Sequence, residues 1–516
     1  MGMDMFKYYL KKIDWVFVVI FLLALVIRIA QFKNGINWQN ADTARDMLVA
    51  KHINLYEEYP LKGPHAVGGY NLLLNSTAYY YFWAFVWKIL PSEIVVPSIM
   101  TIVGMGIIIM CYLIGNLMLD KLPKYLWLII ITFSPSLIVS SINPSQPGLV
   151  VFFGLIIIYG LIKFYKTGNC LWLLWSVLGN WLSLEIHYSI FSLYPLFTLL
   201  FMASFIKWKN HLSKTKSWLI ILIAGSVSLF VWIMTTYRIN PGDQIDYFST
   251  WLNRFNLDLS SILSGVTFLI KNLILDLISN NVYLRKLTLT VGFILITGAI
   301  KIIIKKEWWL LIWEVGIMSG LIIIATQLSL FSSIYYSMSY YVLFSLLLIC
   351  LMEKILPKNI VKIIFISLII IKIVNSYQEY GFKYNQNNVG VEDLTDVIYN
   401  DYLNNFQDKN FSFNILHDTG FQLYDFSSVI LWYWLEKKVG RQLVKLDVNG
   451  NNFYPINSNH NWAYLICSNF GGYGGDENNC QSKFVNNYPK EYKLTFIEKN
   501  QVEKQLRWSI YRVIIR

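Results

Sequence analysis

The chain has 516 residues, of which 55% are hydrophobic, 16% aromatic and only 14% charged. This composition excludes an ordinary soluble enzyme, because apolar runs of about 20 residues, each long enough to cross a bilayer, recur along the chain. The net charge of +12 comes without a block of Lys and Arg that could follow a nucleic-acid backbone, so we expect no nucleic-acid partner.

The first apolar run covers residues 13–32. No small-residue cleavage site follows it, which indicates a retained membrane anchor rather than a removed signal peptide. Lys7, Lys11 and Lys12 precede the run and place the N-terminus in the cytoplasm. Arg28 lies inside the run, close to its outer end, and we expect its charged group to snorkel to the interface.

Basic loops set the predicted topology. The apolar segment 76–90 is short and contains Lys88, and counting it as a span would move the following basic loops to the outside, so we predict an interfacial helix there. The later apolar runs are then the spans 94–118, 125–141, 149–165, 171–186, 189–206, 217–237, 285–304, 308–327, 335–352 and 359–376. This gives a polytopic α-helical membrane protein of about eleven spans, with the N-terminus inside and the C-terminus outside.

Two long outer loops belong to this transmembrane module, which we place at residues 1–377. The first outer loop is 33–92, and the second long one is 238–284. The second contains an apolar stretch at 262–280 that is either a re-entrant or a surface helix.

The composition becomes polar from residue 378 onward. Periodicity predicts helices at 392–405 and 421–438, and strands at 411–416, 462–468, 492–498 and 506–515. We expect residues 378–516 to form a small α/β domain outside the membrane. Its two cysteines, Cys467 and Cys480, either pair in an oxidising compartment or remain free thiols.

A charged motif follows the first span, within residues 39–52. Read as a helix, it places Asp42, Arg45, Asp46 and Val49 on one face. One interpretation is a surface helix with Asp42 as its N-cap and with Arg45 and Asp46 as solvated charges. The other is a functional stripe of two carboxylates and a guanidinium beside the membrane.

A second unusual string in the same loop runs from Leu61 to Tyr70 and contains Lys62, His65 and three glycines. Clustered glycines let the backbone approach a ligand closely, and a neighbouring His can donate or accept a hydrogen bond. The alternative is a tight loop with an incidental His.

Together these motifs resemble the GT-C membrane glycosyltransferases, in particular the branch that contains the protein O-mannosyltransferases and the aminoarabinose transferases (glycosyltransferase family 39-like). In that family the first outer loop bears an acidic residue followed by an Arg after one N-terminal span. A Ser-Pro pair, here Ser134-Pro135, ends a later span, and an α/β domain often closes the chain.

The resemblance implies that Asp42 is the catalytic base. A carboxylate at the mouth of a membrane cavity can take the proton of an acceptor hydroxyl as that oxygen attacks the anomeric carbon of the sugar. Attack opposite the departing lipid phosphate inverts the anomeric centre, so no covalent intermediate is needed.

Cations must meet the charge that develops on the departing phosphate. We place Arg45 and Lys62 near it. Other outer-loop cations either join them or snorkel to the interface, namely Lys51, Arg238, Arg254 and Lys271. Asp46 and Tyr70 are further substrate-binding candidates.

The short outer loop 142–148 supplies amides rather than acids. Asn143 and Gln146, together with His65, are expected to orient the sugar or the acceptor. Many relatives carry an Asp in this loop and an acidic pair in the first motif, where this chain has Thr43 after Asp42. A shared metal site is therefore not implied, and a divalent cofactor stays an open alternative.

Two further groups each allow two interpretations. Glu185 and His187, at the outer end of a predicted span, either line a cavity or form a hydrogen-bonded polar pair at a helix end. Tyrosines near the start of the span 335–352 either stack on sugar or lipid or belong to an aromatic belt; these are Tyr335, Tyr336, Tyr340 and Tyr341.

The expected function is an inverting glycosyltransferase of the cytoplasmic membrane, with its active site and C-terminal domain on the outer side. It would move a sugar from a polyprenyl-phosphate carrier to an extracytoplasmic protein, lipid or glycan. Three alternatives remain: a polymerase or ligase that uses lipid-diphosphate donors, a transporter or flippase of lipid-linked glycans, and a scaffold whose C-terminal domain binds partners.

Overall fold

A computed structural model of the chain is mainly helical. It describes, apart from a few isolated positions, residues 14–31, 41–61, 77–92, 94–144, 146–212, 258–278, 300–326, 338–355, 389–405, 414–417, 428–446, 453–455, 462–468, 492–502 and 505–515. Four helices in this part are long and apolar enough to cross a membrane, namely Val95–Met118, Gly148–Thr167, Ser189–Lys209 and Trp308–Ala325.

The chain divides into two compact units. The helical unit comprises Met1–Lys33, His65–Ser76 and Val96–Phe382, and the mixed unit comprises Asn34–Pro64, Thr77–Val95 and Lys383–Arg516. The sequence places the whole first outer loop in the transmembrane module, whereas the structure groups most of that loop with the C-terminal segment.

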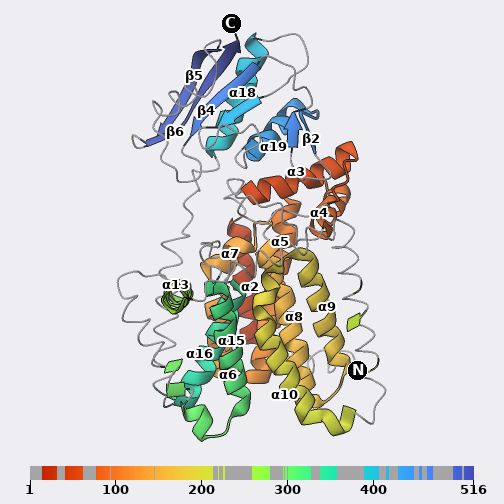
Figure 1. Cartoon of the computed structure of the whole chain (residues 1–516), viewed down its shortest axis with the longest axis vertical. Coiled ribbons are helices and arrows are strands. Elements are labelled where there is room, and N and C mark those ends of the chain that lie inside the picture. Colours follow the sequence, from red (N-terminus) through yellow and green to blue (C-terminus); the bar gives the residue numbers. More distant parts are fainter. Residues whose placement is uncertain are drawn as a thin grey trace, which may run out of the picture. The chain divides into compact units, whose positions relative to one another are not determined.

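The described elements of the helical unit are one 3-10 helix and ten α-helices. They are α2 (Trp15–Gln31), α5 (Val95–Met118), α6 (Lys121–Thr132), α7 (Pro135–Ser140), α8 (Gln146–Thr167), α9 (Leu171–Ile186), the 3-10 helix η2 (Tyr188–Leu193), α10 (Tyr194–Leu212), α13 (Leu259–Ile278), α15 (Trp308–Thr326) and α16 (Met338–Ile355) (Figure 1).

Most of the predicted apolar runs in this part are helices, but one differs. The run 125–141 is broken into α6 and α7 at Ser134-Pro135, because Ser134 is the N-cap of α7 and Pro135 begins it. The predicted spans 217–237, 285–304 and 359–376 lie wholly or largely outside the described residues.

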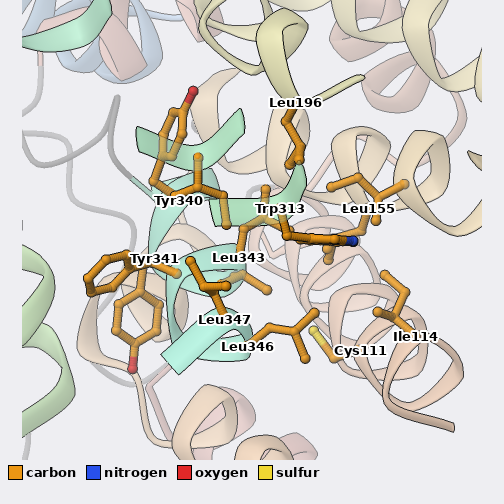
Figure 2. Close-up of a cluster of buried hydrophobic side chains, with 14 of the residues drawn as sticks. Cys111, Ile114, Leu155, Leu196, Trp313, Tyr340, Tyr341, Leu343, Leu346 and Leu347 are labelled. Carbon is orange, nitrogen blue, oxygen red and sulfur yellow. The ribbon is translucent and has the colours of Figure 1, made fainter. Parts of the chain in front are cut away.

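The core of the helical unit is built from aromatic and aliphatic side chains of several helices. Figure 2 shows Trp313 of α15 near Leu155 of α8 and Leu196 of α10, and Trp313 is 1% exposed. Tyr340 and Tyr341 of α16 belong to the same cluster, with 0% and 2% exposure. The sequence interpretations of these two tyrosines as a sugar platform or an interfacial belt are therefore wrong, since both side chains are packed inside.

Small residues bring α8 and α9 into close contact. A Cβ on Gly160 would lie 2.6 Å from the backbone oxygen of Trp172, and one on Gly179 would lie 2.9 Å from the backbone oxygen of Phe153. Ser176 of α9 donates a hydrogen bond to the Ile157 carbonyl of α8 at 2.9 Å. Close backbone approach through Gly and Ser is the usual way to pack apolar helices in lipid, where no hydrophobic effect drives association.

The helix α13 differs in orientation from its neighbours α15 and α16. Figure 1 views α13 nearly along its axis while α15 and α16 are seen lengthwise, so α13 crosses them at a steep angle. It packs on α15, and its Leu269 is buried while Leu263 and Phe268 are exposed. This helix occupies most of the apolar stretch 262–280, and its surface or re-entrant position stays a prediction.

The mixed unit joins first-loop helices to a C-terminal sheet. Its elements are α3 (Ala41–Tyr56), α4 (Ala78–Ile89), α18 (Val389–Asn405), β1 (Asn414–His417), α19 (Ser428–Val439), β2 (Val444–Leu446), β3 (Phe453–Pro455), β4 (Trp462–Ser468), β5 (Tyr492–Val502) and β6 (Gln505–Ile515). The helices predicted at 392–405 and 421–438 and the four predicted strands are thus confirmed, with shifted ends.

The main sheet has the strand order β1-β4-β6-β5, in which β1 and β4 are parallel and the other neighbours antiparallel. The strands β2 and β3 form a separate antiparallel pair. Asp401 of α18 fixes that helix to the main sheet, because it accepts from Tyr464 Oη at 2.8 Å and from Arg512 Nε at 3.0 Å. Cys467 of β4 is disulfide-bonded, and its predicted partner Cys480 lies outside the described residues.

We expect Gly160→Ala to destabilise the helical unit, because its methyl group would meet the Trp172 carbonyl, which is backbone and cannot move aside. Overpacking of this kind costs about 1–3 kcal/mol. Gly225→Ala is the matched control, since no atom of the described residues lies within 4 Å of its added Cβ. Thermal unfolding in detergent measures both variants. Equal melting temperatures for the two would contradict the close packing of α8 and α9.

Candidate active site

The charged motif of the first outer loop forms the helix α3, as the sequence predicts. Asp42 lies in its first turn, but its side chain is outside the described part of the molecule. Arg45 and Asp46 are buried, with 5% and 1% exposure. The interpretation of these two residues as solvated surface charges is therefore wrong.

Arg45 and Asp46 pair with each other. Arg45 donates from Nε at 3.0 Å and from Nη2 at 2.7 Å to the same carboxylate oxygen, Asp46 Oδ1. A charge-assisted contact of this kind is stronger than a neutral hydrogen bond. Both side chains are buried, so this contact fixes their direction on this face of α3.

Helix α4 covers the same region of α3. The side chain of Asn54 on α3 donates to the Ala84 carbonyl of α4 at 2.6 Å. Tyr79 of α4 is 1% exposed. Burial and then the nearby charge of Asp46 raise the pKa of Tyr79, so its hydroxyl stays protonated and keeps a donor for a hydrogen bond.

A second charged network lies at the C-terminal end of α3, centred on the fully buried His52. Its Nδ1 lies 2.8 Å from Glu58 Oε2, and its Nε2 lies 3.1 Å from Glu436 Oε2. Lys51 approaches the same Glu436 oxygen at 3.3 Å. One imidazolium thus bridges a carboxylate of the first outer loop and a carboxylate of α19.

Both carboxylates are also held by donors from the segment that follows α19. Glu436 Oε1 accepts from the backbone N–H groups of Leu443 at 2.8 Å and Val444 at 3.2 Å. Glu58 accepts from the Leu446 N–H and from the Gln442 amide, at 2.8 and 2.9 Å. The network therefore joins α3, α19 and β2 into one polar cluster.

The protonation states of this cluster follow from its geometry. Burial by itself lowers the pKa of His52, but hydrogen bonds and attraction to Glu436 and Glu58 outweigh it and leave the pKa above its ordinary value. Burial by itself raises the pKa of Glu436 and of Glu58, and the bonds from His52 outweigh it, so both values are lowered. The charged forms of all three residues are therefore stabilised together.

The sequence did not reveal this network. Helical spacing places His52 seven residues after Arg45, on the same stripe, and that spacing was the available signal. Nothing in the sequence marks Glu436, 384 positions away, as its partner.

The predicted residues of the helical unit have local partners. Asn143 and Gln146 are each 8% exposed, and the Asn143 amide donates to the Val139 carbonyl at 3.1 Å. Glu185 accepts from the Trp181 indole at 3.2 Å, one helical turn earlier. His187 Nδ1 accepts from the backbone N–H of residue 189 at 3.1 Å and caps η2.

Glu185 and His187 thus each form a hydrogen bond at the end of α9, to Trp181 and to the backbone of residue 189 respectively, and a contact of either residue with substrate stays a prediction. Four other predicted site residues lie outside the described part of the chain, namely Lys62, His65, Tyr70 and Arg238. Within the described part, no group of three or more His, Cys, Asp or Glu side chains is arranged to hold a metal ion.

Comparison with known proteins gives no family assignment: no protein-family model matches the sequence, and no curated protein matches it significantly.

The sign of the pH dependence of the His52 network follows from these shifts. Stabilisation by His52 is complete below its ordinary pKa of 6.5 and is lost as the pH rises through its higher folded value. Stabilisation by Glu58 and Glu436 is complete above their ordinary pKa of 4.5 and is lost as the pH falls through their lower folded values. All three residues of the network therefore contribute their full stabilisation between pH 4.5 and pH 6.5.

We expect His52→Gln to lower the melting temperature in this interval, because it leaves two carboxylates buried without their shared cation. Breaking such a buried pair costs about 3 kcal/mol or more. The difference between wild type and variant should narrow as the pH rises above 6.5. Thermal unfolding over a series of buffers, followed by tryptophan fluorescence, measures this difference.

Lys354→Gln is the control for this experiment, since it removes an exposed ion pair with Glu307. Such pairs contribute at most about 1 kcal/mol, so we expect little change at any pH. A difference for His52→Gln that stays constant or widens in alkaline buffers would rule out a protonated His52 in the network.

Proposed function

We propose that this chain is an integral membrane glycosyltransferase of GT-C architecture, similar to the protein O-mannosyltransferase and aminoarabinose transferase group. It has about eleven spans, with α3, α4 and the C-terminal α/β part outside the cytoplasmic membrane. It transfers a sugar, with inversion, from a polyprenyl-phosphate carrier to an extracytoplasmic acceptor.

The observation that carries the proposal is the buried stripe on α3. A short polar helix that follows an apolar helix would ordinarily expose its charges to water, yet Arg45 and Asp46 are nearly inaccessible and paired. Charged groups that a protein buries at such a cost are concentrated at functional sites. The four long apolar helices supply the membrane setting that a lipid-linked donor requires.

In the proposed reaction the carboxylate of Asp42 accepts the proton of the acceptor hydroxyl. The hydroxyl oxygen forms a bond to the anomeric carbon while the bond from that carbon to the phosphate oxygen breaks. The lipid phosphate leaves with the bonding electrons, and a nearby cation stabilises its charge. The role of the Arg45–Asp46 pair is to hold the first turns of α3 in a fixed orientation.

We expect Asp42→Asn to abolish sugar transfer, with a loss of at least 100-fold, because an amide cannot accept the proton; general-base catalysis typically supplies about 10²–10⁴-fold. The variant should insert into the membrane and unfold like the wild type. Asp120→Asn is the control, since this exposed residue precedes α6. Transfer of sugar from a radiolabelled polyprenyl-phosphate donor is the measurement. Retained transfer by Asp42→Asn would remove Asp42 from the mechanism.

A donor comparison separates the proposed enzyme from its alternatives. We expect transfer from sugars on polyprenyl monophosphate and none from sugars on polyprenyl diphosphate, assayed with purified protein, with and without a chelator. Transfer from the diphosphate alone would favour a polymerase or ligase. Movement of lipid-linked sugar across liposomes without any transfer would favour a flippase.

A further inference from the structure

Arg28 has an unusual position for a charged residue of an apolar helix. It lies in the last turn of α2 and is 0% exposed. The prediction that its charged group snorkels to the interface is therefore wrong. Arg28 continues the buried face of α2 that Ile20 and Ala24 form. The opposite face of this helix exposes large apolar side chains, including Val19 and Val26.

The guanidinium is held by uncharged groups. Its Nε donates to Ser141 Oγ at 3.1 Å, and its Nη1 donates to the Ala24 carbonyl at 3.1 Å. The Ser141 hydroxyl in turn donates to the Leu137 carbonyl. The backbone carbonyl of Ser141 accepts a hydrogen bond from Thr101 Oγ1 at 3.2 Å. The partner of Arg28 is thus itself fixed between α5 and α7.

A glycine makes room for this arrangement. A Cβ on Gly104 of α5 would lie 2.6 Å from Ser141 Cβ and 3.0 Å from Arg28 Nε. Any larger side chain at this position would displace both the hydroxyl and the guanidinium. The three helices α2, α5 and α7 therefore form a cradle around one cationic group.

The charge of this group is not compensated within the described residues, where Arg28 forms no ion pair. A guanidinium has five N–H donors, and the two hydrogen bonds above use two of them, which leaves enough donors on Nη1 and Nη2 for a bidentate contact. A buried unpaired ion costs several kcal/mol, and an ionisable residue at membrane depth marks a functional site by default.

Phosphate is the anion that fits this position. The planar guanidinium matches phosphate geometry and tolerates partial desolvation better than an ammonium group. In the proposed topology the last turn of α2 lies at the outer surface, which is the depth of the phosphate group of a lipid-linked donor.

We propose that Arg28, held by Ser141 and Gly104, binds the phosphate group of the polyprenyl-linked donor. This inference rests on the proposed function and deepens it, because it assigns the cation that meets the departing group. Arg28 belongs to none of the outer-loop cations that the sequence suggests for this role.

The test measures binding without sugar transfer. Farnesyl phosphate is the probe, and farnesol, which has the same chain without the charge, is its control. We expect farnesyl phosphate to raise the melting temperature of the wild-type protein in detergent and farnesol to leave it unchanged. Arg28→Gln should weaken binding of farnesyl phosphate by about 30-fold or more, the usual effect of removing one partner of a buried charged contact. Arg28→Lys should retain part of the affinity.

Two further variants complete the design. Ser141→Ala keeps the charge but removes the hydroxyl that orients it, so it should weaken binding less than Arg28→Gln does, and it keeps the proposal testable if Arg28→Gln fails to fold. Lys354→Gln removes an exposed cation elsewhere in the helical unit and should bind farnesyl phosphate like the wild type.

Binding of farnesyl phosphate at wild-type affinity by Arg28→Gln, or by Ser141→Ala if the first variant does not fold, would overturn the proposal. So would equal competition by phosphatidylglycerol, which would identify a phospholipid headgroup site. The outcomes are separable from those of the proposed function: binding through Arg28 without any sugar transfer refutes the transferase alone, while transfer with Arg28-independent binding refutes this site alone.

Discussion

The mixed unit depends on one buried carboxylate, that of Glu436. Its side chain is fully inaccessible and accepts from His52, from Lys51 and from the backbone N–H groups of Leu443 and Val444. An isolated carboxylate in this position would be very costly, so these donors together stabilise the buried charge. A single ionised group thereby fixes the position of α3, the end of α19 and the start of β2.

The helical unit follows a different principle. Its helices pack through apolar side chains such as Trp313 and through close backbone approach at Gly160 and Gly179. In lipid such packing, rather than the hydrophobic effect, holds helices together. Against this background the guanidinium of Arg28 is an exception, and the fold accommodates it with a glycine and a hydroxyl instead of a carboxylate.

Local features could be predicted from the sequence where one chain segment determines them. Hydrophobic length located the apolar helices, and alternation located the C-terminal strands, because both signals reside in neighbouring residues. The Ser134-Pro135 motif predicts the end of a span, whereas in the structure its N-cap serine and first-turn proline begin a new helix.

The division into units could not be predicted, because it depends on contacts between segments hundreds of residues apart. For the same reason the sequence identified Arg45 and Asp46 as candidates but missed their burial, and missed the partners of His52 entirely.

The grouping of α3 with the C-terminal segment also determines the order in which this protein can be completed during synthesis. His52 leaves the ribosome 384 residues before Glu436. At about 5–20 residues per second, synthesis of the intervening residues takes roughly 20–80 seconds before the partner is made. Until then α3 has no buried anion on α19 against which to fold. The network that joins α3 to α19 and β2 can therefore form only after Glu436 and the segment 442–446 have been made.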